Sequence, residues 1–196
     1  MAEEYEYLLK LIVVGDGGVG KTAMSVRFSK GIFTEDYKMT IGVDFHVKTI
    51  PIETVEGVTT CKLQVWDTGG QERFGQIRPV YYHGSLGAVL VFDLTDHASF
   101  EHLPHWIEEV RNNVKAPIPI LLVGNKSDLS DNRAVSTKEV NNFTKNFNLF
   151  YMETSAKSGD GVGNCFYIIT SLMIGVEIPE QLLANQTVFN PGQITL

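Results

Sequence analysis

The sequence predicts an α/β domain in which helices cover both faces of a mostly parallel sheet. Short apolar, β-branched runs alternate with helical patterns along most of the 196 residues, as in parallel sheets joined by right-handed crossovers. A short turn at Glu56-Gly57 joins two long strand-like runs, which should make them antiparallel neighbours. No linker or repeat divides the chain, and one domain of this length can bury an adequate core. We therefore expect six strands, one of them antiparallel, and five helices.

The individual elements follow from the spacing of apolar residues and from the turn residues between them. Pro104 lies inside the third helical pattern, and the regular helix should start close to it because a first turn tolerates proline. The end of the chain is polar, so we expect a domain over residues 1–180 and a tail over residues 181–196. The predicted strands are residues 8–14, 43–55, 59–66, 86–92, 118–123 and 149–152, and the predicted helices include residues 21–30, 99–114, 137–147 and 161–176.

Composition and charge exclude several classes of protein. The net charge is −7 and the isoelectric point is about 5.2, which argues against general binding to nucleic acid or anionic lipid. The acidic N-terminus lacks the features of a signal peptide, and no apolar run reaches the roughly 18 residues of a membrane span. Cys61 and Cys165 form no disulfide pattern and should be free thiols. We expect a cytoplasmic protein.

A phosphate-binding loop is indicated at residues 15–22, which fit the pattern G-x-x-x-x-G-K-[ST]. The pattern follows an apolar strand and opens a helix, which disfavours the alternative of a glycine-rich turn without a ligand. Glycines let backbone N–H groups surround phosphate oxygens, and the helix N-terminus adds its positive dipole end. Lys21 should reach the β- and γ-phosphates, and the Thr22 hydroxyl should bind Mg²⁺. The predicted phosphate-binding residues are Asp16, Gly17, Gly18, Val19, Gly20, Lys21, Thr22 and Ala23.

A guanine-binding site is indicated at residues 125–128, which read Asn-Lys-Ser-Asp and follow a predicted strand. The carboxyl end of a parallel strand faces the ligand crevice. The Asp128 carboxylate can accept hydrogen bonds from N1–H and the exocyclic amine of guanine, whereas adenine would leave it unpaired. Alone, this tetrapeptide could also be a polar turn before a helix, and the upstream phosphate loop favours the guanine site. The predicted base contacts are Asn125, Lys126, Asp128, Ser155, Ala156 and Lys157.

The phosphate-binding loop, the segment at residues 125–128 and three further stretches together resemble the Ras superfamily of small GTPases, and most closely its Rab branch. These stretches are residues 40–45 (Thr-Ile-Gly-Val-Asp-Phe), 66–74 (Trp-Asp-Thr-Gly-Gly-Gln-Glu-Arg-Phe) and 153–157 (Glu-Thr-Ser-Ala-Lys). The likeness runs from about residue 8 to residue 176. It implies a P-loop NTPase G domain and a molecular switch that binds GTP or GDP with Mg²⁺ and hydrolyses GTP.

The resemblance also implies which residues respond to the γ-phosphate of GTP. Thr40 would contact Mg²⁺ and the γ-phosphate, Asp67 would hold Mg²⁺ through water, and the Gly70 N–H would contact the γ-phosphate. Without that phosphate, both loops would lose the contacts that offset their ordering entropy. The implied metal-binding residues are Thr22, Thr40 and Asp67.

Catalysis is assigned by the same resemblance to Gln71, which would orient the attacking water while Lys21 neutralises charge. No arginine occurs between residues 28 and 40, so we expect slow turnover that an activating protein stimulates. Phe33 and Tyr37 are implied among the nucleotide-binding residues. For Phe33 the alternative is an anchor in the core.

An effector surface of partly exposed apolar residues is also implied, although Trp66 could equally pack within the sheet. The predicted surface consists of Ile41, Phe45, Trp66 and Tyr81. The expected partners are GTP-dependent effectors, an exchange factor and a GTPase-activating protein, and we expect a monomer active in vesicle trafficking or an ancestral equivalent. Two alternatives stay open: a GTP-holding scaffold, which Gln71 disfavours, and an ATP-using enzyme, which Asp128 disfavours.

The sequence departs from the Rab pattern in three places. Gly69 stands where Rab proteins usually have alanine, so this segment should be looser. The stretch between Phe45 and Trp66 is about four residues longer than usual, with the extra length near residues 53–58. No cysteine follows Cys165, so the prenylation motif of Rab proteins is absent and any membrane association would be peripheral, through partners. A shortened C-terminus and an unprenylated relative both remain open.

Overall fold

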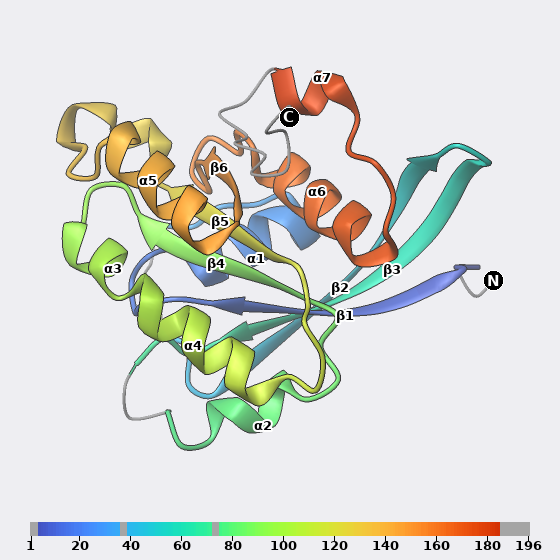
Figure 1. The fold of residues 1–196 in the computed structure, drawn as a ribbon, viewed down its shortest axis with the longest axis horizontal. Coiled ribbons are helices and arrows are strands. Elements are labelled where there is room, and N and C mark those ends of the chain that lie inside the picture. The colour runs from blue at the N-terminus through green and yellow to red at the C-terminus, as the bar shows by residue number, and fades with distance from the viewer. Residues whose placement is uncertain (1–3, 36–38, 72–74, 185–196) are drawn as a thin grey trace.

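The fold is built on one six-stranded sheet with helices on both faces (Figure 1). The computed structural model describes residues 4–35, 39–71 and 75–184. Across the sheet the strands lie in the order β2-β3-β1-β4-β5-β6. They are β1 Tyr7–Val14, β2 Val43–Thr54, β3 Gly57–Thr68, β4 Gly87–Asp93, β5 Ile120–Asn125 and β6 Phe150–Thr154.

β2 is the antiparallel strand, and it pairs with β3, while the remaining neighbours are parallel, as predicted. The β2–β3 ladder ends at the pair Thr54–Gly57, so the two-residue turn lies one position earlier than expected. Gly57 has a φ of 128°, which a side chain would disfavour. Figure 1 shows this hairpin projecting past the rest of the sheet.

The helices begin and end at recognisable local signals. A capping box of Ser136 and Glu139 starts the helix at residues 137–147. The third helical pattern divides at His102, and the longer part then starts with Pro104 in its first turn, as predicted. That division and a short last helix give seven α-helices in the described ranges, where five were expected. They are α1 Lys21–Lys30, α2 Arg78–Tyr82, α3 His97–Glu101, α4 Leu103–Asn113, α5 Thr137–Phe147, α6 Val162–Ile174 and α7 Glu180–Ala184, with a 3₁₀ helix at Ser127–Asn132.

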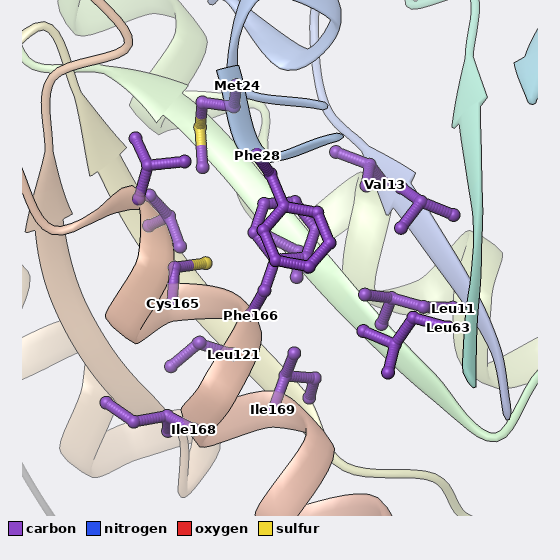
Figure 2. Packing of buried hydrophobic residues seen from close by; sticks show 14 of the residues in the cluster. Leu11, Val13, Met24, Phe28, Leu63, Leu121, Cys165, Phe166, Ile168 and Ile169 are labelled. Carbon is purple, nitrogen blue, oxygen red and sulfur yellow. The ribbon is translucent and has the colours of Figure 1, made fainter. Parts of the chain in front are cut away.

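Two apolar layers fill the space between the sheet and its helices. On the face covered by α1 and α6, the rings of Phe28 and Phe166 stack with centroids 3.9 Å apart (Figure 2). On the other face, Leu103 and Trp106 of α4 are buried. Strands β4 and β5 are buried along their whole length. These layers hold the carboxyl ends of the strands in fixed positions, and the site lies there.

The chain continues past α6 along the first of these layers. Val176, Ile178 and Leu182 pack against it. The expected boundary at residue 180 stays a prediction, since residues 185–196 lie outside the described part. Cys61 and Cys165 are buried free thiols. No helix in the described residues has the length and apolar character needed to cross a bilayer.

Candidate nucleotide-binding site

A cavity of about 480 Å³ opens at the carboxyl ends of the strands, where the sequence places the nucleotide. Segments that follow β1, β3 and β5 line it, together with the loop before β2. The predicted site residues that line this cavity are Gly17, Gly18, Gly20, Lys21, Thr22, Ala23, Phe33, Thr40, Gly70, Gln71 and Lys126. Val19 and Asn125 are buried beside it. Tyr37 lies outside the described residues.

Lys21 begins α1 with its ammonium group enclosed by the loop at residues 15–22. The Nζ atom donates to the carbonyl oxygens of Gly15 at 2.8 Å and Asp16 at 2.6 Å. Burial lowers the pKa of Lys21 from 10.5 to about 8, because the charged form loses its hydration. Phosphate oxygens beside this group would stabilise its charged form, so the lysine is suited to bind them.

Two glycines permit close contacts at this loop, one with a side chain and one with a backbone segment. A Cβ atom on Gly20, which has a φ of 99°, would lie 2.2 Å from Nδ2 of Asn125. A Cβ atom on Gly70 would lie 2.4 Å from the carbonyl oxygen of Gly15. The segment after β3 therefore rests directly on the phosphate loop, and only glycine fits at the contact.

Three oxygen-bearing side chains that were predicted to bind metal converge beside Lys21. The hydroxyls of Thr22 and Thr40 are 2.6 Å apart, and the Thr22 hydroxyl also donates to Asp67 Oδ2. Asp67 is fully buried, and its Oδ1 atom has no hydrogen-bond partner among the described residues. Burial raises the pKa of Asp67 to about 6. An unpaired buried carboxylate oxygen beside two hydroxyls fits Mg²⁺, which prefers oxygen ligands.

The segment after β3 also contacts the segment before β2. The Gly69 N–H donates to the carbonyl oxygen of Gly42 at 2.8 Å. The Gln71 side chain lies over the phosphate loop, since its Cγ atom would be 3.7 Å from a Cβ atom on Gly17. Gln71 thus faces the part of the cavity predicted to hold the γ-phosphate. Residues 72–74 lie outside the described part.

The predicted guanine end is tied to the phosphate end by one amide side chain. Asn125 Nδ2 donates to the carbonyl oxygen of Val19 at 2.9 Å, while its Oδ1 accepts from the Ala156 N–H. Lys126 adopts a left-handed φ of 68°, and its ammonium pairs with Asp93 at 2.5 Å. With this backbone conformation, Lys126 lines the cavity.

Asp128 is the residue predicted to read the base, and it is an exposed residue that lies outside the cavity lining. Its Oδ1 atom accepts from the Ser155 hydroxyl at 2.6 Å. Arg27 of α1 supports the loop of Ser155 by donating to the carbonyl oxygens of Ala156 and Lys157. The carboxylate predicted to read the base is thus joined directly to the loop at residues 155–157.

Comparison with known proteins matches the Ras family over residues 10–174. The chain belongs to the Ras family of small GTPases. It is 38% identical over 196 residues to the Ras-related protein RGP1 of Oryza sativa subsp. japonica, covering all of this chain and 85% of that protein. It is 39% identical over 189 residues to RABA4b of Arabidopsis thaliana, with coverages of 96% and 83%. It is also 42% identical over 166 residues to Rab-13 of Bos taurus, with coverages of 85% and 80%.

Membership of the Ras family confirms the fold class and makes the chain a GTP hydrolase. The family implies GTP and GDP binding with Mg²⁺, together with exchange factors, activating proteins and effectors as partners. Its relatives are Rab proteins, so the Rab resemblance is confirmed as well. The role of each site residue in this GTPase stays a prediction.

Two supporting residues of the GTPase site escaped the sequence reasoning. Arg27 holds the loop after β6, and its guanidinium lies 5.9 Å from the centroid of the Phe33 ring. Asp93 ends β4 beside β5 and pairs with Lys126. The position of Asp93 at the carboxyl end of a parallel strand was the available signal. Nothing in the sequence marked Arg27.

Three of the predicted effector residues of this small GTPase lie side by side on β2, β3 and α2, and Ile41 lies in the loop just before β2. Phe45 and Ile41 are exposed. The Phe45 and Trp66 rings meet edge to face at 5.5 Å, and the Tyr81 ring is 6.3 Å from Trp66. Trp66 is only partly exposed, since it packs against the buried cluster on one face of the sheet, and the Lys10 ammonium lies 3.9 Å from its ring centroid. Trp66 is therefore partly packed within the sheet and partly available at the predicted effector surface.

His102, which lies between α3 and α4, contacts the phosphate loop, and the sequence did not indicate this contact. Its Nδ1 atom is 2.6 Å from Asp16 Oδ2, and Trp106 Nε1 donates to Asp16 Oδ1 at 2.6 Å. Asp16, predicted to bind nucleotide, thus points away from the cavity and fastens the loop to α4. Only its backbone remains available to the phosphates.

We expect the His102→Gln variant to lose stability at low pH only. The hydrogen bond and charge of Asp16 raise the pKa of His102. A raised histidine pKa stabilises the fold below the ordinary value of about 6.5, and this contribution disappears as pH rises through the raised value. Because the side chain is 59% exposed, the effect should stay below about 1 kcal/mol. Thermal unfolding of both GDP-bound proteins at pH 6 and pH 9 measures it, and an equal difference at both values would contradict it.

Proposed function

We propose that the chain is a Rab-like switch that hydrolyses GTP slowly and recruits effectors in its GTP-bound form. The proposal rests on the presence of phosphate-binding and guanine-binding groups at two ends of one site. A buried ammonium at Lys21 and an unpaired carboxylate oxygen at Asp67 lie at the phosphate end. The exposed carboxylate of Asp128 lies at the base end, where it can pair with two donors of guanine.

The proposed mechanism is positioning and charge stabilisation. Mg²⁺ held by Thr22, Thr40 and Asp67 would neutralise charge on the β- and γ-phosphates. Lys21 neutralises negative charge on the β- and γ-phosphate oxygens as GDP leaves. The Gln71 amide orients the attacking water against the γ-phosphate, and this is the step that raises the hydrolysis rate.

The switch follows from the contacts that depend on the γ-phosphate. Thr40 and Gly70 come from the two segments that meet through the Gly69–Gly42 hydrogen bond. Ordering each loop residue costs about 1–2 kcal/mol of backbone entropy. Loss of the γ-phosphate removes the contacts that offset this cost, so both segments relax and the adjoining surface of Ile41 and Phe45 changes.

Turnover without a partner should be slow, on the order of 10⁻⁴ s⁻¹, because the segment before Thr40 supplies no arginine. A GTPase-activating protein would supply that arginine, and an exchange factor would release GDP. By likeness to Rab proteins, the pathway is membrane or vesicle trafficking. The chain would act at the cytoplasmic face of those membranes.

The nucleotide that copurifies with the protein tests the proposal directly. Denaturation followed by chromatography should release GDP or GTP, and release of ADP or ATP would overturn the assignment. Protein reloaded with GTP should then release phosphate when Mg²⁺ is added, and EDTA should stop the release. A protein that keeps GTP intact through many hours with Mg²⁺ would be a scaffold and not a working GTPase.

A further inference from the structure

A buried arginine contacts the segment at residues 69–71, which is called the catalytic segment below. Arg78 begins α2 and is 2% exposed. Its Nη1 atom donates to the carbonyl oxygens of Gly69 at 3.2 Å and Gln71 at 3.0 Å. These two carbonyls flank Gly70, so one guanidinium group holds the backbone on both sides of that residue.

The other side of the same guanidinium is fixed by α4. Arg78 Nε and Nη2 donate to the two oxygens of Glu109 at 2.8 and 2.7 Å. The Tyr82 hydroxyl donates to Glu109 as well, at 2.6 Å. Burial alone would raise the pKa of Glu109, but the hydrogen bonds from Arg78 and Tyr82 lower it overall. The ion pair is therefore satisfied on both sides, and α4 anchors the arginine.

The arginine also connects the catalytic segment to the phosphate loop. Its guanidinium carbon lies 4.3 Å from the centroid of the Trp106 ring. The indole N–H of Trp106 is bonded to Asp16 in the phosphate loop. Arg78 thus fixes Gly69 and Gln71 relative to the loop that would hold the phosphates.

Two adjacent glycines give the catalytic segment a particular need for the hydrogen bonds from Arg78. Gly69 and Gly70 lose more conformational entropy on ordering than other residues would. The N–H of Gly69 is held by Gly42, but the position of the next peptide groups depends on the bonds from Arg78. A bidentate, planar guanidinium can hold two carbonyls and a carboxylate together, which a lysine ammonium cannot.

We propose that Arg78 is a positioning residue for GTP hydrolysis, which holds Gly70 and Gln71 against the γ-phosphate. The inference rests on the proposed function, since it assumes that Gln71 orients the attacking water. Arg78 acts through the backbone and touches no substrate atom. Its loss should therefore slow hydrolysis while leaving nucleotide binding at Lys21 and Asp128 intact.

The test compares Arg78→Lys and Glu109→Gln with Arg111→Lys as the matched control. Arg111 lies on the same helix as Glu109, and its guanidinium is 3.4 Å from the carbonyl oxygen of Phe147. Each GTP-loaded protein is triggered with Mg²⁺, and single-turnover phosphate release, GDP dissociation and melting temperature are measured. We expect Arg78→Lys to slow phosphate release about tenfold, because small displacements of reacting groups are costly. Glu109→Gln should slow it less, and GDP dissociation should not change.

A second comparison distinguishes positioning from a purely structural ion pair. In a Gln71→Leu background, Arg78→Lys should cause a smaller further loss of hydrolysis than in the wild type, because part of its effect passes through Gln71 and the rest through Gly70. A further loss of the same size would overturn the proposal, as would unchanged phosphate release in Arg78→Lys alone. Parallel changes in hydrolysis, GDP dissociation and melting temperature would also overturn it. If Gln71→Leu itself hydrolyses GTP at the wild-type rate, the proposed function fails first and this inference falls with it.

Discussion

Replacing Asp128 by asparagine should lower the affinity for GDP by about 10²- to 10⁴-fold. The carboxylate would lose two hydrogen bonds with guanine, each worth about 1.5–3 kcal/mol for a charged acceptor. The asparagine amide should instead favour xanthine, whose C2 oxygen accepts a hydrogen bond where guanine donates one. The dissociation constants of fluorescent GDP and XDP for both proteins measure this exchange of specificity.

Asp131→Asn is the matched control because Asp131 is exposed in the same 3₁₀ helix. It removes the same charge close to the site and should leave the preference for GDP unchanged. If Asp128→Asn also retained that preference, the carboxylate would not read the base. A loss of both GDP and XDP binding together with a lower melting temperature would instead indicate damage to the loop that Ser155 supports.

Replacing Gln71 by leucine should slow single-turnover phosphate release by roughly 10- to 100-fold. The change removes the only side-chain amide among the described cavity residues, and loss of one oriented polar group in the transition state costs about this much or more. Binding of GDP should be unaffected, because Gln71 would contact the attacking water and not the diphosphate. Phosphate release from GTP-loaded protein and the rate of GDP dissociation measure the two effects separately.

Gln76→Leu serves as the control, since Gln76 is exposed in the same segment. It should hydrolyse GTP at the wild-type rate. Equal rates for the wild type and Gln71→Leu would contradict the catalytic role. An equal reduction in both variants would show that the segment as a whole, and not the amide of Gln71, determines the rate.

Local sequence patterns predicted the elements that carry the site. The strand before Gly15, the helix that starts at Lys21 and the strand that precedes Asn125 are all present. Each depends on an apolar run next to a chemically distinctive loop, so neighbouring residues suffice to define it. For the same reason, most residues of the predicted phosphate loop line the cavity, although the Asp16 side chain points away from it.

Long-range side-chain pairs could not be predicted in the same way. Asp16 and His102 are 86 positions apart, and Arg78 and Glu109 are 31 apart. Which face of α4 meets the phosphate loop depends on packing against β4 and on the division of the helix at residue 102. A periodic pattern shows that a helix has a buried side, but it does not show which partner a polar residue on its rim will reach.

The long β2–β3 hairpin shows where a G domain can accept added length without disturbing its chemistry. Antiparallel strands that grow equally at the turn keep every earlier pair opposite its partner, so Asp44 still faces Asp67. Two more residues in each strand would carry the turn about 7 Å farther out. The length of this hairpin can therefore change in evolution without altering the opposite end of the same two strands, where metal binding is predicted.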